Sequence, residues 1–186
     1  MKKQKTVLEL AFSSMFLALA LVLPFFTGQI PQISSKLCPM HIPVLLCGYV
    51  CGGTWGLAVG AVAPLLRSLM FSMPVLFPTA FSMAFELAVY GFVSGTLYRI
   101  LPKRRLNNYL SLVLAMISGR LVSGVVQFCC MGLDTTKFSL STFWAGTFVN
   151  TVPGIIIQLI ISFHLQVVIK TLLVWKHHVH KVLTNG

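Results

Sequence analysis

Long apolar runs, separated by short polar or proline- and glycine-containing segments, follow one another along this 186-residue chain. A helix of about 20 apolar residues is long enough to cross the hydrocarbon core of a bilayer. The composition agrees with such helices, because 56% of the residues are hydrophobic and only 9% are charged. We therefore predict an all-α integral membrane protein that forms a single domain over residues 1–186.

Six runs qualify as membrane spans when they are bounded at polar, proline or glycine residues. They cover about residues 8–26, 41–50, 55–71, 79–101, 109–131 and 140–168. We expect these six transmembrane helices to form one bundle, followed by a basic amphipathic tail over about 170–186. The second run is too short to cross ~30 Å as a straight helix. We expect it to be tilted, partly irregular or shielded by its neighbours.

The basic residues predict how the bundle is oriented, since cytoplasmic loops of membrane proteins are enriched in Lys and Arg. The formal net charge is +11. With the N-terminus inside, ten of the 14 basic residues fall at the cytoplasmic face, Lys36 and Lys137 lie in outer loops, and Arg67 and Arg120 lie in or near spans. The opposite orientation leaves Lys36 and Lys137 as the only cytoplasmic loop charges. We therefore place both termini in the cytoplasm. Because this orientation accounts for the excess of basic residues, we expect no nucleic-acid binding.

Polar residues recur at helical spacing on three of the predicted spans. These stripes are Thr79, Ser82, Glu86 and Tyr90 on the fourth span, Arg120, Ser123, Gly124 and Gln127 on the fifth, and Thr147, Asn150, Thr151, Gly154 and Gln158 on the sixth. A charge at mid-bilayer costs at least roughly 2.5–3.5 kcal/mol, so those that persist there usually mark a functional site. The stripes therefore predict a functional site within the bundle.

The rise of about 1.5 Å per helical residue gives the depth of these groups. Glu86 and Asn150 fall ~12 Å below the outer ends of their helices, and Arg120 falls ~16 Å below. Arg67 lies near the outer end of the third span. We predict that these groups converge in a cavity that opens to the outside.

Two interpretations of Glu86 and Arg120 remain open. They can pair with each other and lock the helices together. Alternatively, Arg120 binds the carboxylate of a small polar solute in a bidentate manner, while Glu86 accepts hydrogen bonds from hydroxyl or amide groups. The stripes carry more polar groups than one ion pair needs, which favours the second interpretation. The candidate solute-binding residues are then Glu86, Arg120, Asn150, Arg67, Gln127, Ser82, Tyr90 and His41.

His41 opens the second span beside Pro39 and Pro43. A lone histidine there is either structural or part of the solute site. The five cysteines form no metal-binding pattern, so we expect neither a metal nor a cofactor.

Catalysis is not expected from this chain. A single acid at membrane depth and the absence of an HExxH motif argue against an intramembrane hydrolase. The chain also has no GxxxxGK[ST] motif, so it cannot hydrolyse ATP itself. A stand-alone secondary transporter remains an alternative, although residues 1–93 and 94–186 show no convincing internal repeat.

Several segments together resemble one family of membrane proteins. They are residues 37–48 (LCPMHIPVLLCG), 52–60 (GGTWGLAVG), 63–67 (APLLR), 85–91 (FELAVYG) and the basic turn at 103–105 (KRR). On these segments, and over nearly its whole length, the chain resembles the substrate-binding S component of an energy-coupling factor (ECF) vitamin transporter. The resemblance implies a multi-pass subunit of the cell membrane that binds a vitamin from outside. It implies as partners an energy-coupling transmembrane subunit and two ABC-type ATPases.

The resemblance also implies a docking face on the first helix. Family members carry an Ala-x-x-x-Ala motif there, which contacts the energy-coupling transmembrane subunit. The nearest match in this chain is Ser14-x-x-x-Ala18, with Ala11 on the same face, whereas Ala11-x-x-x-Met15 departs from the motif. Small residues at this spacing let two helix backbones approach closely.

The stretch Pro-Met-His-Ile-Pro at residues 39–43 most resembles pantothenate-type S components. Arg120 suits a carboxylate, and Glu86 and Asn150 suit hydroxyl and amide groups. Riboflavin is less favoured, because no stripe rich in aromatic residues offers a surface for a large flat ring. Folate, pyridoxine, a hydroxymethylpyrimidine and a cobalamin-type ligand remain open.

Overall fold

A computed structural model describes residues 2–26, 39–101, 105–131, 171 and 174 of the chain. The described helices are α1 (Lys2–Phe26), α3 (His41–Cys51), α4 (Gly53–Phe71), the short π-helical turn η1 (Leu76–Ala80), α5 (Phe81–Ile100) and α6 (Arg105–Met131). Within these ranges every regular element is helical, as the sequence predicted. The expected sixth span, the loop before α3 and most of the basic tail lie outside the described residues.

Four segments of the described chain are long and apolar enough to cross a membrane. They are Thr6–Phe25, Gly53–Phe71, Leu76–Ile100 and Leu110–Cys130. They correspond to the first, third, fourth and fifth predicted spans. The protein is therefore a membrane protein with multiple spans.

The second predicted span is α3, which is only 11 residues long. All of its residues except Ile42 are buried inside the protein. An apolar helix of this length is typical of a protein core rather than of a bilayer crossing. Of the three expectations for this segment, shielding by neighbouring helices is therefore the one that the structure shows.

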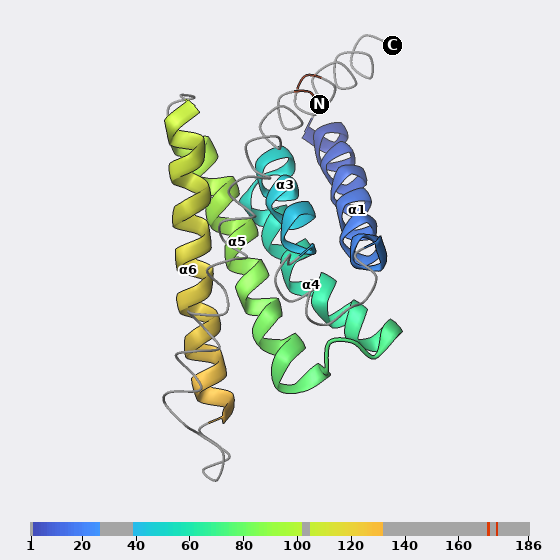
Figure 1. Ribbon diagram of the computed structural model, residues 1–186. Helices are drawn as coiled ribbons and strands as arrows, with labels where there is room; N and C mark the ends of the chain where they lie inside the picture. Colours follow the sequence, from blue (N-terminus) through green and yellow to red (C-terminus); the bar gives the residue numbers. More distant parts are fainter. Residues whose placement is uncertain (1, 27–38, 102–104, 132–170, 172–173, 175–186) are drawn as a thin grey trace.

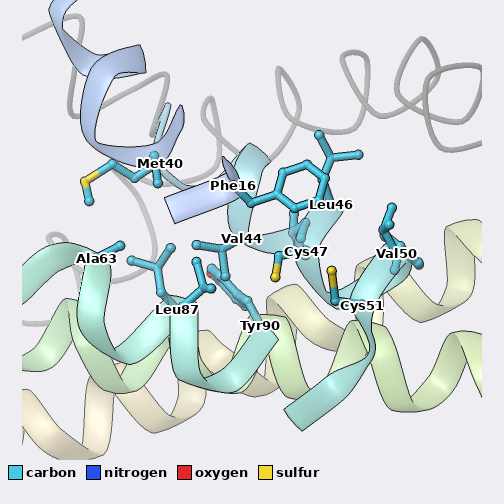
Figure 2. Close-up of a cluster of buried hydrophobic side chains, with 14 of the residues drawn as sticks. Phe16, Met40, Val44, Leu46, Cys47, Val50, Cys51, Ala63, Leu87 and Tyr90 are labelled. Atoms are coloured by element: carbon cyan, nitrogen blue, oxygen red, sulfur yellow. The ribbon is translucent and has the colours of Figure 1, made fainter. Parts of the chain in front are cut away.

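Helix α5 lies at the centre of the described bundle, where it contacts α3, α4 and α6, while α1 packs against α3 and α4 (Figure 1). Figure 2 shows buried side chains of the core, among them Phe16 of α1, Val44 and Cys47 of α3, and Leu87 and Tyr90 of α5. All five are buried. The core thus surrounds the segment of α5 that carries Glu86.

Glycines allow the backbones of α4 and α5 to touch. A Cβ atom on Gly56 would lie 2.6 Å from the carbonyl oxygen of Gly91, and a Cβ on Gly91 would meet the backbone of Gly56. A Cβ on Gly60 would likewise meet the carbonyl of Leu87. Such distances are shorter than non-bonded carbon contacts, so only glycine fits at these positions. The small residues of the third predicted span therefore serve close packing.

Polar contacts also join the helices at the end of the bundle where α1 begins. The indole Nε1 of Trp55 donates to Glu9 Oε2 at 3.2 Å, which links α4 to α1. The hydroxyls of Tyr49 and Ser111 share a hydrogen bond at 3.0 Å, which links α3 to α6. These bonds give the acid and the hydroxyls partners within an apolar surrounding. The four residues that make these bonds are separate from the turn of α5 that carries Glu86.

Candidate functional site

Four polar side chains from three helices meet at one carboxylate oxygen, and we call this group the Glu86 cluster: His41, Glu86, Tyr90 and Arg120. The Tyr90 hydroxyl donates a hydrogen bond of 2.9 Å to Glu86 Oε1. Arg120 Nε lies 3.1 Å from the same oxygen, and His41 Nε2 lies 3.6 Å from it. Glu86 itself is only 4% exposed. The structure therefore joins α3, α5 and α6 at a single buried acid.

Helical spacing and one glycine account for this geometry. Glu86 and Tyr90 lie one turn apart on the same face of α5, so their side chains can meet. Gly119, which precedes Arg120 on α6, provides the space for the Tyr90 ring, because a Cβ there would collide with that ring. The His41 ring lies against the other side of the cluster, with its centroid 5.1 Å from that of Tyr90. Tyr90 is thereby fixed with its hydroxyl on Glu86.

The cluster members differ in how far they are withdrawn from solvent and lipid. The side chain of Arg120 is 19% exposed, whereas that of Glu86 is 5% exposed and that of His41 is 2% exposed. Carboxylate and guanidinium balance each other, and a buried pair of opposite charges avoids most of the cost of an isolated buried charge. Arg120 is therefore the member through which the cluster is most accessible from outside the protein.

A second polar contact between α5 and α6 lies one turn away from Glu86. Gln127 Nε2 donates to the hydroxyl of Ser82 at 3.4 Å, and that hydroxyl donates to the carbonyl of Thr79 at 3.1 Å. Ser82 is fully buried, and Ser123 of α6 is buried as well. The stripes predicted on the fourth and fifth spans therefore face each other across α5 and α6.

The structure places Arg67 of α4 in a different environment. Its Nη1 donates to the carbonyl oxygen of Leu21 on α1 at 3.0 Å. Its guanidinium carbon lies 5.3 Å from the ring centroid of Phe25 and 5.9 Å from that of Phe71. Both distances allow a cation–π interaction. Among the described residues, these contacts tie Arg67 to α1 and to its own helix rather than to the Glu86 cluster.

The remaining candidate positions fall into two groups. Asn150 and the rest of the sixth-span stripe lie outside the described residues. On α1, Ala11, Ser14 and Ala18 all lie on an exposed face. The Ser14 hydroxyl donates back to the carbonyl of Ala11 at 2.9 Å. The hydroxyl is thus satisfied within its own helix, and these three positions present only small side chains to a neighbour.

Sequence reasoning missed Gly119 and the aromatic pair around Arg67. A glycine directly before an intramembrane arginine is a signal for close approach by a neighbouring side chain, but nothing in the sequence names Tyr90 as that neighbour. Phe25 and Phe71 pack edge to face at 4.8 Å and lie 46 residues apart in the chain. Their meeting depends on the packing of α1 against α4.

Membrane-length helices around a buried, ion-paired polar cluster define a multi-pass membrane protein built around a polar site. A family model, the ECF transporter substrate-specific component, matches residues 8–169. The chain therefore belongs to the family of ECF transporter substrate-specific components. Proteins of this family are transport subunits without catalytic activity that bind a vitamin-type substrate. Comparisons with curated proteins and with solved structures gave no significant match.

Proposed function

We propose that this chain captures pantothenate, or a closely similar small vitamin, from outside the cell at the Glu86 cluster. The observation that carries the proposal is the convergence of one acid, one histidine and one tyrosine at buried positions with one partly buried arginine on membrane helices. Charged and polar groups are costly at this depth and are retained mainly for function. The family supports a vitamin-type substrate.

The chemistry of the cluster fits the groups of pantothenate, which are a carboxylate, an amide and two hydroxyls. Arg120 is the most exposed member of the Glu86 cluster, and a guanidinium can hold a carboxylate with two parallel hydrogen bonds. Glu86 accepts hydrogen bonds from ligand hydroxyl or amide groups. Ser82 and Gln127 provide further polar groups beside the cluster, and Asn150 is expected to complete the site from the sixth span.

The basic residues support an outward-facing site. With both termini in the cytoplasm, α5 begins and α6 ends on the outer side of the membrane. The Ser82–Gln127 contact then lies closer to the outside than Glu86 and Arg120 do. A ligand from outside meets these uncharged groups first and the charged pair afterwards. Folate, pyridoxine, a hydroxymethylpyrimidine, riboflavin and a cobalamin-type ligand are the competing substrates.

We propose that partner subunits carry out the delivery of the vitamin. We infer that the exposed face of α1 with Ala11, Ser14 and Ala18 docks on the energy-coupling transmembrane subunit, which works with two ABC-type ATPases. Small side chains and the internally bonded Ser14 hydroxyl allow another helix to approach this face closely. The family implies association with such an energy-coupling module.

The proposed function is tested with the purified chain alone. We expect mass spectrometry to detect a co-purified vitamin, and calorimetry to show tight binding of added pantothenate after that vitamin is removed. Failure of every water-soluble vitamin to bind would contradict the proposed function. Tight binding of another vitamin would retain the vitamin-binding role and replace the substrate.

Uptake by membrane vesicles separates this function from stand-alone transport. Accumulation of labelled pantothenate is expected only when the energy-coupling subunit and both ATPases are present with the chain. Undiminished accumulation by the chain alone would favour a secondary transporter.

Replacing Arg67 by methionine tests whether this arginine is a structural clamp. We expect the stability of the folded protein to fall by about 1–3 kcal/mol, because the hydrogen bond to Leu21 and both aromatic contacts are lost. Vitamin affinity is expected to change by no more than about twofold, as is usual for sites that share no partners. Thermal unfolding and calorimetry measure the two effects. A large loss of affinity with unchanged stability would instead place Arg67 in the binding site.

A further inference from the structure

His41 is the member of the Glu86 cluster whose hydrogen-bonding groups have no partner among the described residues. The side chain is 2% exposed, and neither ring nitrogen makes a hydrogen bond within the described part of the chain. The distance of 3.6 Å from Nε2 to Glu86 Oε1 is longer than a hydrogen bond. Buried polar groups are nearly always hydrogen-bonded, and an exception calls for an explanation. Among the residues that the structure describes, the imidazole of His41 therefore lacks the bonding that a buried polar group ordinarily has.

The formal charges of the Glu86 cluster give a reason why this imidazole is kept at the site. Glu86 and Arg120 balance each other, and the predicted sixth span over about 140–168 contains no Asp, Glu, Lys or Arg. If an anionic ligand enters and binds Arg120, one negative charge is left in excess within a buried surrounding. An uncompensated buried charge is strongly unfavourable. A proton taken up by a group inside the cluster would supply the balancing positive charge.

We propose that His41 takes up one proton when the ligand binds, and that this makes the site selective for an anion. The inference rests on the proposed function, because it concerns the ligand of the same site. Imidazole is the side chain that most readily exchanges a proton near neutral pH. Protonated on both nitrogens, His41 donates from Nε2 to Glu86 and from Nδ1 to a further acceptor. The loaded cluster then carries two positive and two negative charges.

The charged groups on the helices packed around His41 have partners of their own, which favours His41 as the proton acceptor. From α5, Glu86 Oε1 already accepts a hydrogen bond from Tyr90 and lies against Arg120 of α6. From α4, Arg67 is held by Leu21 and two aromatic rings. From α1, Glu9 is bonded to Trp55 at the other end of the helix. Both nitrogens of His41, in contrast, are open to a new bond within the described part of the protein.

The proton balance of the step is simple. A buffer acid or hydronium ion releases the proton, an N–H bond forms on the imidazole, and the bound carboxylate stays ionised. The proton leaves again when the anion leaves. Affinity for the anion therefore falls as pH rises, by up to about tenfold per pH unit for the uptake of one proton.

Calorimetry measures this proton uptake directly. Pantothenate is titrated into the purified full chain at one mildly alkaline pH, in buffers that differ in ionisation enthalpy. We expect close to one proton taken up per ligand bound. The alcohol analogue of pantothenate, in which CH2OH replaces the carboxylate, is the matched ligand. It is expected to bind without proton uptake.

Two histidine variants then test whether His41 is the group that takes up the proton. His41→Gln is expected to abolish proton uptake and to weaken pantothenate binding about 10- to 100-fold, the loss of one charge-assisted hydrogen bond. His164→Gln removes the other histidine of the predicted spans and is expected to leave proton uptake unchanged. If His41→Gln does not fold, the comparison of the acid with its alcohol in the unaltered protein still tests whether proton uptake accompanies binding of the anion.

The possible results separate this inference from the proposed function. Binding of pantothenate without proton uptake, or uptake that persists in His41→Gln, would overturn the inference alone. The same holds if, in a panel with folate, pyridoxine and riboflavin, only an uncharged vitamin binds tightly. If no vitamin of the panel binds, the vitamin-binding role is contradicted and the inference falls with it.

Discussion

Replacing Arg120 by methionine is expected to destabilise the protein by about 3–5 kcal/mol, the usual cost of removing one partner from a buried ion pair. The cause is the Glu86 carboxylate, which remains 3.6 Å from a histidine but loses the guanidinium at 3.1 Å. Thermal unfolding in detergent measures the effect. Pantothenate binding is expected to disappear in the same variant.

A double variant separates the two roles of the pair. Glu86→Gln combined with Arg120→Met removes both charges, so we expect most of the lost stability to return. Binding of pantothenate is still expected to be lost, because the cation proposed to hold the carboxylate is absent. If the double variant binds pantothenate as well as the unaltered chain does, the two charges serve only to join α5 and α6. Arg120→Lys is a useful companion, because it keeps the charge and removes the planar donor pair.

Replacing Gly91 by alanine is expected to cost at least about 3 kcal/mol, at the upper end for overpacking. The added methyl group would overlap the backbone of Gly56, and a backbone cannot move aside as a flexible side chain can. Helices α4 and α5 would have to separate, and α5 also carries Glu86 and Tyr90. We therefore expect lower thermal stability together with weaker vitamin binding.

Ala58 provides the control for this change. It lies on the exposed side of α4, two residues from Gly56, so Ala58→Val adds volume to the same helix without entering the contact with α5. This variant is expected to unfold at nearly the same temperature as the unaltered protein. If Gly91→Ala is equally well tolerated, the close approach of α4 and α5 does not occur.

Much of this fold could be predicted from the sequence because apolar runs of membrane length are a strong signal. The boundaries of α4 and α5 lie within a few residues of the predicted spans, and the shortness of α3 was visible from the glycines at 52 and 53. The number of spans and the orientation of the termini stay predictions, since the sixth span lies outside the described residues.

The polar site was predictable only in part. Helical periodicity placed Glu86, Tyr90 and Arg120 on facing stripes, and the structure brings these three together. The same reasoning grouped Arg67 with them, whereas its described contacts are with Leu21, Phe25 and Phe71. Depth along a helix follows from counting residues, but the neighbour that a side chain faces depends on how helices rotate and pack. The identity of the vitamin depends on still finer geometry.

A single atom, Oε1 of Glu86, is shared by side chains of α3, α5 and α6. We expect a ligand that draws Arg120 away from this oxygen to weaken the link between α6 and the other two helices. Helix α3 in turn contacts α1, which has no side chain in the cluster. We therefore expect any effect of ligand binding on the exposed face of α1 to pass through the contacts of α1 with α3 and α4.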